Sequence, residues 1–191
     1  TCDVVGLDTM AHVVKTMRDT LPDDPWHLLY RTPAVLAGLV AKGALGQKTR
    51  AGFFRKTGKT IEVLDPVAQD YRPAAGQVDP EVAAILALKH PGEKLAKLRS
   101  HPHPQAQFLW AIFRDLFHYC AVHLAAIADS ARDVDLALRW GFGWSTGPFE
   151  LWQAAGWQDV AGWVADDIAA GKALASVPLP AWVGAGPAAA G

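Results

Sequence analysis

The chain has 191 residues, of which 51% are hydrophobic, and a formal net charge of −1. This length and composition allow one ordinary domain or two small helical ones, and they exclude a disordered tail. The near-neutral charge argues against non-specific nucleic-acid binding, which needs a clustered excess of Lys and Arg.

The start of the chain, its longest apolar stretch and its two cysteines restrict the class of protein further. No basic region followed by an apolar run opens the chain, and the longest apolar stretch, 121–128, is too short for a membrane span. The absence of an initiator Met indicates a fragment or a processed chain. Cys2 and Cys120 lie too far apart for a disulfide framework or a zinc site, and they favour a cytoplasmic setting.

The first third of the chain predicts two helices. Apolar residues recur at helical spacing from Met10 to Met17, after the N-cap Asp8, so we expect a helix over 9–19. Thr32-Pro33 predicts the start of a second helix, with Thr as cap and Pro in the first turn.

The next stretch predicts a loop and a hairpin. Gly43 is a helix stop, and 46–54 is too polar and rich in glycine for helix. The segments 53–56 and 59–64, on either side of a Thr-Gly turn, predict a small β-hairpin that must pack on the helices. Residues 72–79 are the clearest candidate linker.

The remainder predicts a helical domain. Asp79-Pro80 and His90-Pro91 each open a short helix, and the longest helical segment runs over about 105–129. Its expected buried face consists of Leu109, Ile112, Phe113, Leu116, Cys120, His123 and Ile127. We expect Phe108, Ala111 and Val122 to widen that face.

The end of the chain predicts three more helices. Ser130 and Asp133 form an N-terminal cap for a helix to about Trp140. A loop over 141–148 leads into helices ending near 155 and spanning about 158–170. From Val177 the Pro-, Gly- and Ala-rich sequence predicts a tail or linker.

Two distant stretches share a short pattern. Around Gly6 and around Gly156 a helix ends, a bulky apolar residue follows the glycine, and a new helix begins. Glycine suits such a junction because it adopts positive φ without a steric penalty. The match is a weak repeat by itself.

Three segments carry a family resemblance. Residues 137–151, with Gly141-Phe-Gly143 and Gly147-Pro148-Phe, resemble the signature of the 3-hydroxyacyl-CoA dehydrogenase C-terminal domain. Residues 3–8 resemble the stretch that follows this signature in the family. Residues 45–54 resemble its closing Leu-Gly-x-Lys-Thr-Gly-x-Gly-Phe-Tyr motif.

The resemblance implies an all-α fold of the 6-phosphogluconate dehydrogenase C-terminal-like kind, with one small β-hairpin. The order of the motifs implies that 1–75 completes one copy of the domain, 76–183 is a second copy and 184–191 is a tail or linker. Tandem copies occur in fused multifunctional members of the family, which also carry an enoyl-CoA hydratase region.

The implied parent is an NAD-dependent enzyme that oxidises L-3-hydroxyacyl-CoA to 3-ketoacyl-CoA in fatty-acid β-oxidation. The family's catalytic His–Glu pair and NAD site lie in a domain that would precede Thr1, so no catalytic, NAD-binding or metal-binding residue is expected here. The family's helical domain opens its long helix with Asn-Arg, whereas this chain has Gln107-Phe108. The second copy is therefore expected to be non-catalytic and to pack on the first.

Two readings of the whole chain stay open at this point. The first is a region that shapes the substrate cleft and holds domains together, inactive alone. The second is a stand-alone helical interaction module that shares only the fold. Exposure of Val4, Val5 and Met10 would also permit a homo-oligomer of this fragment.

The candidate site residues have a functional and a structural interpretation. Lys48 and Thr49 are either contacts to substrate or a neighbouring domain, or turn residues. The backbone requirements of the motifs are assigned to Gly46, Gly52, Gly141, Gly143, Gly147 and Pro148.

The remaining polar and aromatic candidates favour structural roles. His90, His101 and His103 are expected to be exposed loop residues rather than metal ligands. His123 is expected to be a core histidine, and Asp166 and Asp167 an exposed pair. Core and interface packing is expected for Trp140, Trp144, Trp152, Trp157 and Trp163.

Overall fold

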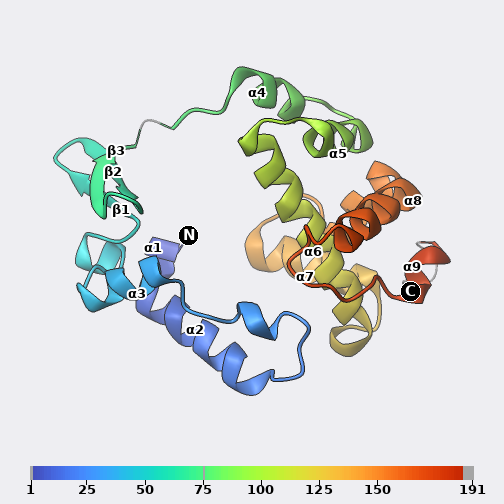
Figure 1. Ribbon diagram of the computed structural model, residues 1–191, viewed down its shortest axis with the longest axis horizontal. Coiled ribbons are helices and arrows are strands. Elements are labelled where there is room, and N and C mark those ends of the chain that lie inside the picture. The colour runs from blue at the N-terminus through green and yellow to red at the C-terminus, as the bar shows by residue number, and fades with distance from the viewer. Residues whose placement is uncertain (1, 75, 187–191) are drawn as a thin grey trace. The chain divides into compact units, whose positions relative to one another are not determined.

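A computed structural model of the chain describes residues 2–74 and 76–186. It divides the chain into two compact units, which we call unit 1 (Thr1–Gln77) and unit 2 (Val78–Gly191). Unit 2 is mainly helical, and unit 1 combines helices with a small sheet (Figure 1). The prediction of a mostly helical fold with a small hairpin is confirmed.

Unit 1 begins with three α-helices that enclose a small core. They are α1 (Cys2–Val5), α2 (Leu7–Thr20) and α3 (Ala34–Ala41). Single 3₁₀ turns form at His27–Leu29 and Gln47–Thr49. The predicted helix over 9–19 is confirmed, but it begins at Leu7, with Gly6 and not Asp8 as its N-cap. The second helix is capped by Pro33 and not by the Thr32 side chain. Leu7, Leu36 and Leu39 are the buried centre.

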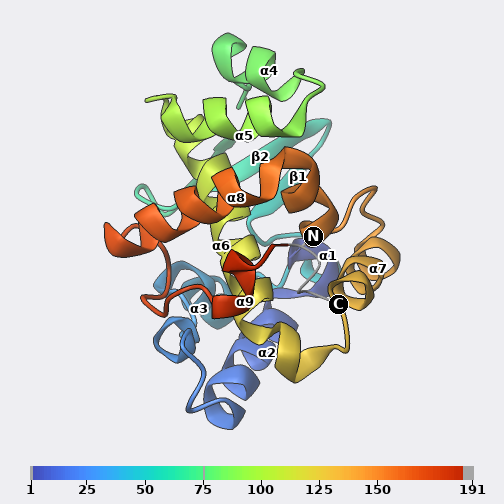
Figure 2. The same ribbon diagram turned by 90° about the vertical axis from the view of Figure 1, so that its right-hand side faces the viewer.

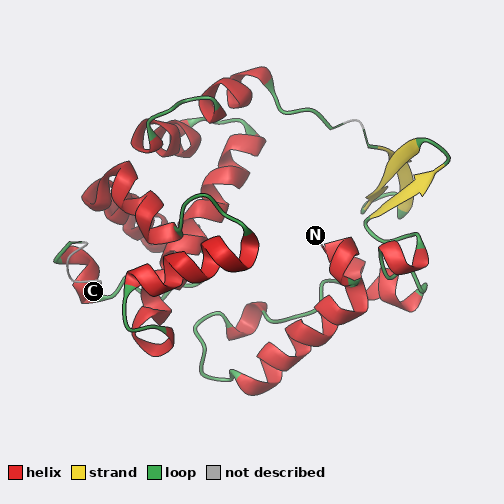
Figure 3. Ribbon diagram, turned by 180° about the vertical axis from the view of Figure 1, so that it is seen from behind, coloured by secondary structure: helices red, strands yellow, loops and turns green. Residues whose placement is uncertain are grey.

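The sheet of unit 1 is antiparallel, with strand order β1-β2-β3 (Figure 3). Its strands are β1 (Phe54–Thr57), β2 (Thr60–Asp65) and β3 (Asp70–Pro73). Pairing of Thr57 with Thr60 confirms the predicted hairpin. The third strand was not predicted, so the linker expected over 72–79 is wrong at its first two residues. Tyr71 holds this strand in place, because its ring lies 4.1 Å from the Arg55 guanidinium carbon.

Unit 2 consists of helices whose starts follow the predicted caps. They are α4 (Pro80–Leu86), α5 (Pro91–Ser100), α6 (Pro104–Ile127), α7 (Ala131–Phe142), α8 (Pro148–Ala169) and α9 (Ala181–Gly184). The Asp79 carboxylate accepts a hydrogen bond from the Glu81 amide at 2.9 Å. The Ser130 amide donates to Asp133 at 3.1 Å, which closes the first turn of α7.

The core of unit 2 forms around α6, with α8 packed against it (Figure 2). The buried face of α6 is formed by Trp110, Phe117, Ala121 and Leu124. The predicted face is therefore wrong in part: Ile112 and Ile127 are exposed, whereas Cys120 is buried as expected. The helix is apolar on nearly all sides, so its periodicity does not select the side that faces the core.

The chain from Val177 packs on unit 2 and is not the tail predicted from its composition. Val183 is buried, and its carbonyl accepts a hydrogen bond from Trp157 Nε1 at 2.8 Å. Residues 187–191, where the tail was also expected, lie outside the described residues.

No individual helix in the described ranges combines the length and apolar character of a membrane span. The pair α6 and α7 meets that criterion when counted together, with a bend of 112° between the two helices.

Candidate functional site

The candidate site of unit 1 is the loop from Gly46 to Phe54, which α1 holds through Asp3. The Asp3 carboxylate accepts hydrogen bonds from the amides of Phe53 at 2.9 Å and Phe54 at 2.7 Å. These partners are 50 and 51 residues away in sequence. The sequence interpretation missed Asp3, because nothing local marks so distant a contact.

The two glycines of this loop are required by close approach to Asp3. A Cβ at Gly46 would lie 2.3 Å from the Asp3 carbonyl oxygen, and a Cβ at Gly52 would lie 2.4 Å from its carboxylate. Gly46 also has φ +99°, which side chains disfavour. Any larger residue would separate the loop from α1.

The Lys48 side chain extends to the first turn of α2, where it binds Asp8. Its Nζ lies 2.6 Å from both carboxylate oxygens of Asp8, and this hydrogen-bonded cation lowers the pKa of that carboxyl. Both side chains are partly exposed, so the pair contributes little to stability, but it fixes the direction of Lys48.

Thr49 forms hydrogen bonds within its own loop. Its hydroxyl accepts from the Leu45 amide at 2.7 Å and lies 3.1 Å from the Ala51 carbonyl. The turn interpretation accounts for this geometry, and a contact to substrate or to a neighbouring domain stays a prediction for both Lys48 and Thr49.

Unit 2 contains a second carboxylate–glycine contact. Buried Asp135 of α7 accepts from the amides of Phe149 at 2.8 Å and Glu150 at 3.0 Å, at the start of α8. A Cβ at Gly147 would lie 2.3 Å from the Asp135 carboxylate. Burial raises the pKa of Asp135, although both amide hydrogen bonds oppose that shift. Asp135 thus fixes the angle between α7 and α8.

The other motif residues of unit 2 have separate roles. Pro148 is buried in the first turn of α8, and Gly143 ends α7 with φ +69°. Gly141 has an ordinary backbone, and an added Cβ would meet nothing within 4 Å among the described residues. No steric contact in unit 2 therefore explains why the signature has glycine at position 141.

The paired glycines of the weak repeat both have a positive φ. Gly6 separates α1 from α2 with φ +109°, and Gly156 breaks α8 with φ +100°. The apolar residues that follow them, Leu7 and Trp157, are both buried. Three residues before Gly156 stands Gln153, so unit 2 has no carboxylate where unit 1 has Asp3.

A buried charge cluster joins α6 to α8. Asp167 is 4% exposed, and its carboxylate lies 2.7 Å from Trp110 Nε1 and 3.4 Å from the Arg114 guanidinium. Asp115 binds the other side of Arg114 at 2.7 Å. The predicted exposed pair is therefore wrong for Asp167, because a helix places adjacent residues on different faces.

The prediction that His123 is the core histidine of α6 also needs correction. His118, not His123, is the fully buried histidine of α6, and its Nε2 lies 2.8 Å from the Val177 carbonyl. Burial lowers the pKa of His118.

The loop histidines differ from one another. His90 is exposed as expected. His101 and His103 are half-buried, because Glu81 lies 3.1 Å from His101 and Asp79 lies 3.7 Å from His103. No group of three or more potential metal ligands occurs in the described part of the chain.

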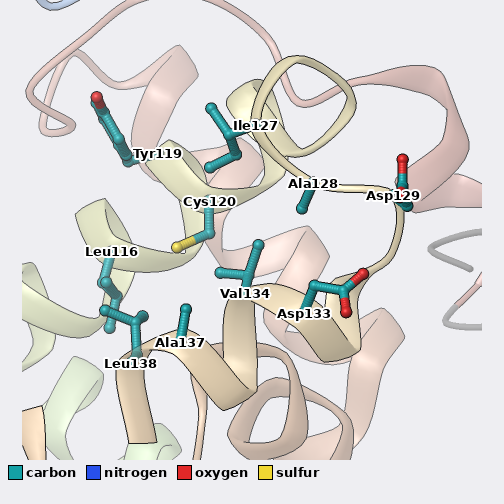
Figure 4. A pocket seen from close by; sticks show the side chains of 10 residues that line it. All are labelled: Leu116, Tyr119, Cys120, Ile127, Ala128, Asp129, Asp133, Val134, Ala137 and Leu138. Atoms are coloured by element: carbon teal, nitrogen blue, oxygen red, sulfur yellow. The ribbon is translucent and has the colours of Figure 1, made fainter. Parts of the chain in front are cut away.

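A hollow of about 610 Å³ lies between α6 and α7 in unit 2. Figure 4 shows Leu116 and Cys120 of α6 facing Val134 and Leu138 of α7 across it. Burial raises the pKa of the Cys120 thiol to about 12, so this sulfur is protonated at neutral pH and is a poor nucleophile. The hollow is an apolar surface rather than a reactive centre.

This geometry describes a helical domain whose glycine-bounded loop is locked onto a helix, without a reactive centre in the described residues. Comparison with known sequences gives the family that part of the chain matches. Residues 1–56 match the profile of the 3-hydroxyacyl-CoA dehydrogenase C-terminal domain. This stretch of the chain is therefore similar to the C-terminal domain of 3-hydroxyacyl-CoA dehydrogenases.

Longer relatives align with most of the chain. A probable 3-hydroxyacyl-CoA dehydrogenase of Bacillus subtilis is 38% identical over 156 residues, covering 82% of this chain and 20% of the relative. A Rickettsia felis protein is 25% identical over 95% of this chain and 24% of its own length. A Rickettsia prowazekii protein gives the same three values. Both rickettsial proteins bear the provisional name fatty acid oxidation complex trifunctional enzyme.

The chain thus spans about a fifth to a quarter of the length of the relatives it matches, 20% and 24%. No solved structure matches it.

Proposed function

We propose that this chain is the C-terminal helical region of an NAD-dependent 3-hydroxyacyl-CoA dehydrogenase, which oxidises L-3-hydroxyacyl-CoA to 3-ketoacyl-CoA in fatty-acid β-oxidation. The match of residues 1–56 to the family domain carries this proposal, because that stretch contains the loop locked by Asp3. The chain's task is to shape the substrate cleft and to hold the domains of the parent together, in the cytoplasm.

The described residues do not fit NAD. A dinucleotide binds at the carboxyl ends of parallel strands, beside a Gly-x-Gly-x-x-Gly turn that opens a helix. The strands of unit 1 are antiparallel, and no such turn follows any of them. NAD, which accepts the hydride when bound, belongs to another part of the parent, and the chain alone is expected to be inactive.

The two units are proposed as two copies of one helical domain, over 1–75 and 76–183, followed by a tail or linker. The support is the positive φ at both Gly6 and Gly156, each followed by a buried apolar residue.

Exposed aromatic residues support the packing role of unit 2. Trp140 is 78% exposed and Phe142 is 71% exposed, and Phe108 and Trp144 are exposed as well. Large exposed apolar side chains mark surfaces that bind other protein. In the parent, the partner would be another helical domain, and the trifunctional names of relatives raise the further candidate of a fused enoyl-CoA hydratase.

The test is oxidation of NADH with acetoacetyl-CoA as substrate. The nucleotide-binding portion of the parent is assayed with and without this chain, and the intact parent serves as positive control. Activity that rises only on mixing supports the proposal. An intact parent without dehydrogenase activity would reject it and leave the interaction module.

A further inference from the structure

The hollow beside the Gly46–Phe54 loop combines free cations with an apolar wall. It has a volume of about 740 Å³, and we call it the basic hollow. Its lining residues are Asp3, Val4, Gln47, Arg50, Phe54, Arg55, Lys56 and Ile61.

Only one of the cations that line the basic hollow is paired with a described carboxylate. The Asp3 carboxylate is held by the amides of Phe53 and Phe54. Arg55 binds Glu62 at 2.5 Å. Arg50 and Lys56 are exposed, and neither forms an ion pair with a described carboxylate. Two cations therefore remain available to an anion.

The backbone holds Arg50 in an unfavourable conformation. Its φ is +62°, in the left-handed region where side chains other than glycine are strained. The Arg50 amide donates to the Gln47 carbonyl at 3.0 Å, so the loop enforces this conformation. Glycine would fit better there, and the arginine adds a positive charge at the edge of the hollow.

The wall next to these cations is apolar. Val4, Phe54 and Ile61 are each more than half exposed. Phe54 and Lys56 project from the same face of β1, and Ile61 pairs with Lys56 across the sheet. The Phe54 ring and the Lys56 ammonium group thus lie on the same side of the β1–β2 strand pair.

We propose that the basic hollow binds a ligand that joins a flat ring to phosphate groups, the chemistry of an adenine nucleotide. The phosphates pair with Arg50 and Lys56, and the ring covers Phe54 and Ile61. A free nucleotide and the 3′,5′-ADP part of coenzyme A share this chemistry. Binding here requires neither dehydrogenase activity nor a second chain.

Titration calorimetry on the whole 191-residue chain at low salt tests the proposal, with 3′,5′-ADP, coenzyme A, ADP and inorganic phosphate as separate probes. The nucleotides bind, and inorganic phosphate binds at least about tenfold more weakly because it lacks the ring. Preference for coenzyme A and 3′,5′-ADP over ADP identifies the coenzyme as the source. Equal affinities identify nucleotides in general.

Matched variants separate this site from general charge attraction. Arg50→Gly and Lys56→Ala each raise Kd about tenfold, because each removes one charge-assisted contact. Lys42→Ala removes the same charge from an exposed position outside the hollow and leaves Kd unchanged. Arg50→Gly suits the positive φ at this position, and an unchanged circular dichroism spectrum of each variant shows that loss of binding does not come from misfolding.

Three results would overturn the proposal. They are no binding of any nucleotide, an equal loss of affinity in Lys42→Ala, and binding of inorganic phosphate as tight as that of 3′,5′-ADP.

Discussion

At the scale of single residues, Asp3 connects the start of unit 1 to the loop near its sheet. One carboxylate satisfies the amides of Phe53 and Phe54, and Gly46 and Gly52 give it the space to approach. Asp3→Ala leaves two amides without their charged acceptor and is expected to destabilise unit 1 by about 2 kcal/mol.

Hydrogen exchange at the Phe53 and Phe54 amides, together with urea denaturation, measures this effect. Both amides should lose protection in Asp3→Ala and keep part of it in Asp3→Asn, which retains one carbonyl oxygen. Exposed Asp23→Ala is the control and should change neither measurement. Unchanged protection in Asp3→Ala would refute the anchoring role.

His118 makes the stability of unit 2 depend on pH. Burial lowers its pKa below the usual 6.5, the hydrogen bond to Val177 and the nearby Asp115 carboxylate oppose that shift, and nearby Arg114 adds to it. The unfolded chain therefore binds more protons than the folded chain between the two pKa values. The free energy of unfolding should fall as pH drops below about 6.5 and level off below the folded pKa.

His118→Gln removes this titration and keeps a donor for the Val177 carbonyl. Urea denaturation of both proteins between pH 7.5 and 5.5 should show a steeper loss of stability in the wild type, by up to about 1.4 kcal/mol for each unit of pKa difference. Exposed His90→Gln should follow the wild type. Parallel curves for the wild type and His118→Gln would contradict the prediction.

At the scale of elements, a pair of adjacent aspartates distinguishes buried from exposed charge on α8. Asp167 is 4% exposed and binds Trp110 and Arg114 of α6, whereas Asp166 faces solvent beside Arg99. Asp167→Ala leaves a buried guanidinium with one carboxylate fewer, so unit 2 should lose about 3 kcal/mol or more. Asp166→Ala should change stability by less than about 0.5 kcal/mol.

Chemical denaturation followed by tryptophan fluorescence compares the two variants directly, since Trp110 itself reports on the cluster. A loss of less than about 0.5 kcal/mol in Asp167→Ala would show that the Asp167 contacts add no more stability than an exposed ion pair. Asp167→Asn serves as a second variant, because it preserves an acceptor for Trp110 while removing the charge.

Sequence patterns predicted the elements of this fold better than their contacts. Caps such as Asp79 and Ser130 mark helix starts because their partners lie within three residues. Strand β3 was missed because only Tyr71 in it is apolar, and its position depends on β2. The faces of α6 were misassigned because a helix that is apolar all round carries no directional signal.

The residues of the candidate site were likewise predicted only in part. The glycines of the 46–54 loop were predicted, because backbone freedom is a property of one residue. The partners Asp3 and Asp8 were not, because each lies about 40 or 50 positions away from its contact. The buried Arg114–Asp167 contact was missed for the same reason, at a separation of 53.

At the scale of the whole molecule, unit 2 has several large apolar side chains that are exposed to solvent. The exposed residues Trp140 and Phe142 close α7, and Phe108 and Ile127 lie near the two ends of α6. The Phe142 and Trp144 rings lie 6.1 Å apart, and neighbouring exposed aromatic side chains mark a binding surface. The chain by itself is therefore expected to associate with itself.

Sedimentation velocity over a range of concentrations measures this association. The weight-average sedimentation coefficient of the wild type should rise with concentration. This rise should persist at high salt, because salt does not screen apolar contacts. Trp140→Asp places a charge in the surface and should shift the equilibrium toward monomer by about tenfold or more. Val67→Asp changes an exposed apolar residue on a turn of unit 1 and is the matched control. A wild type that stays monomeric at high concentration would mean that these aromatic residues do not drive self-association, and would favour a different partner in the parent enzyme.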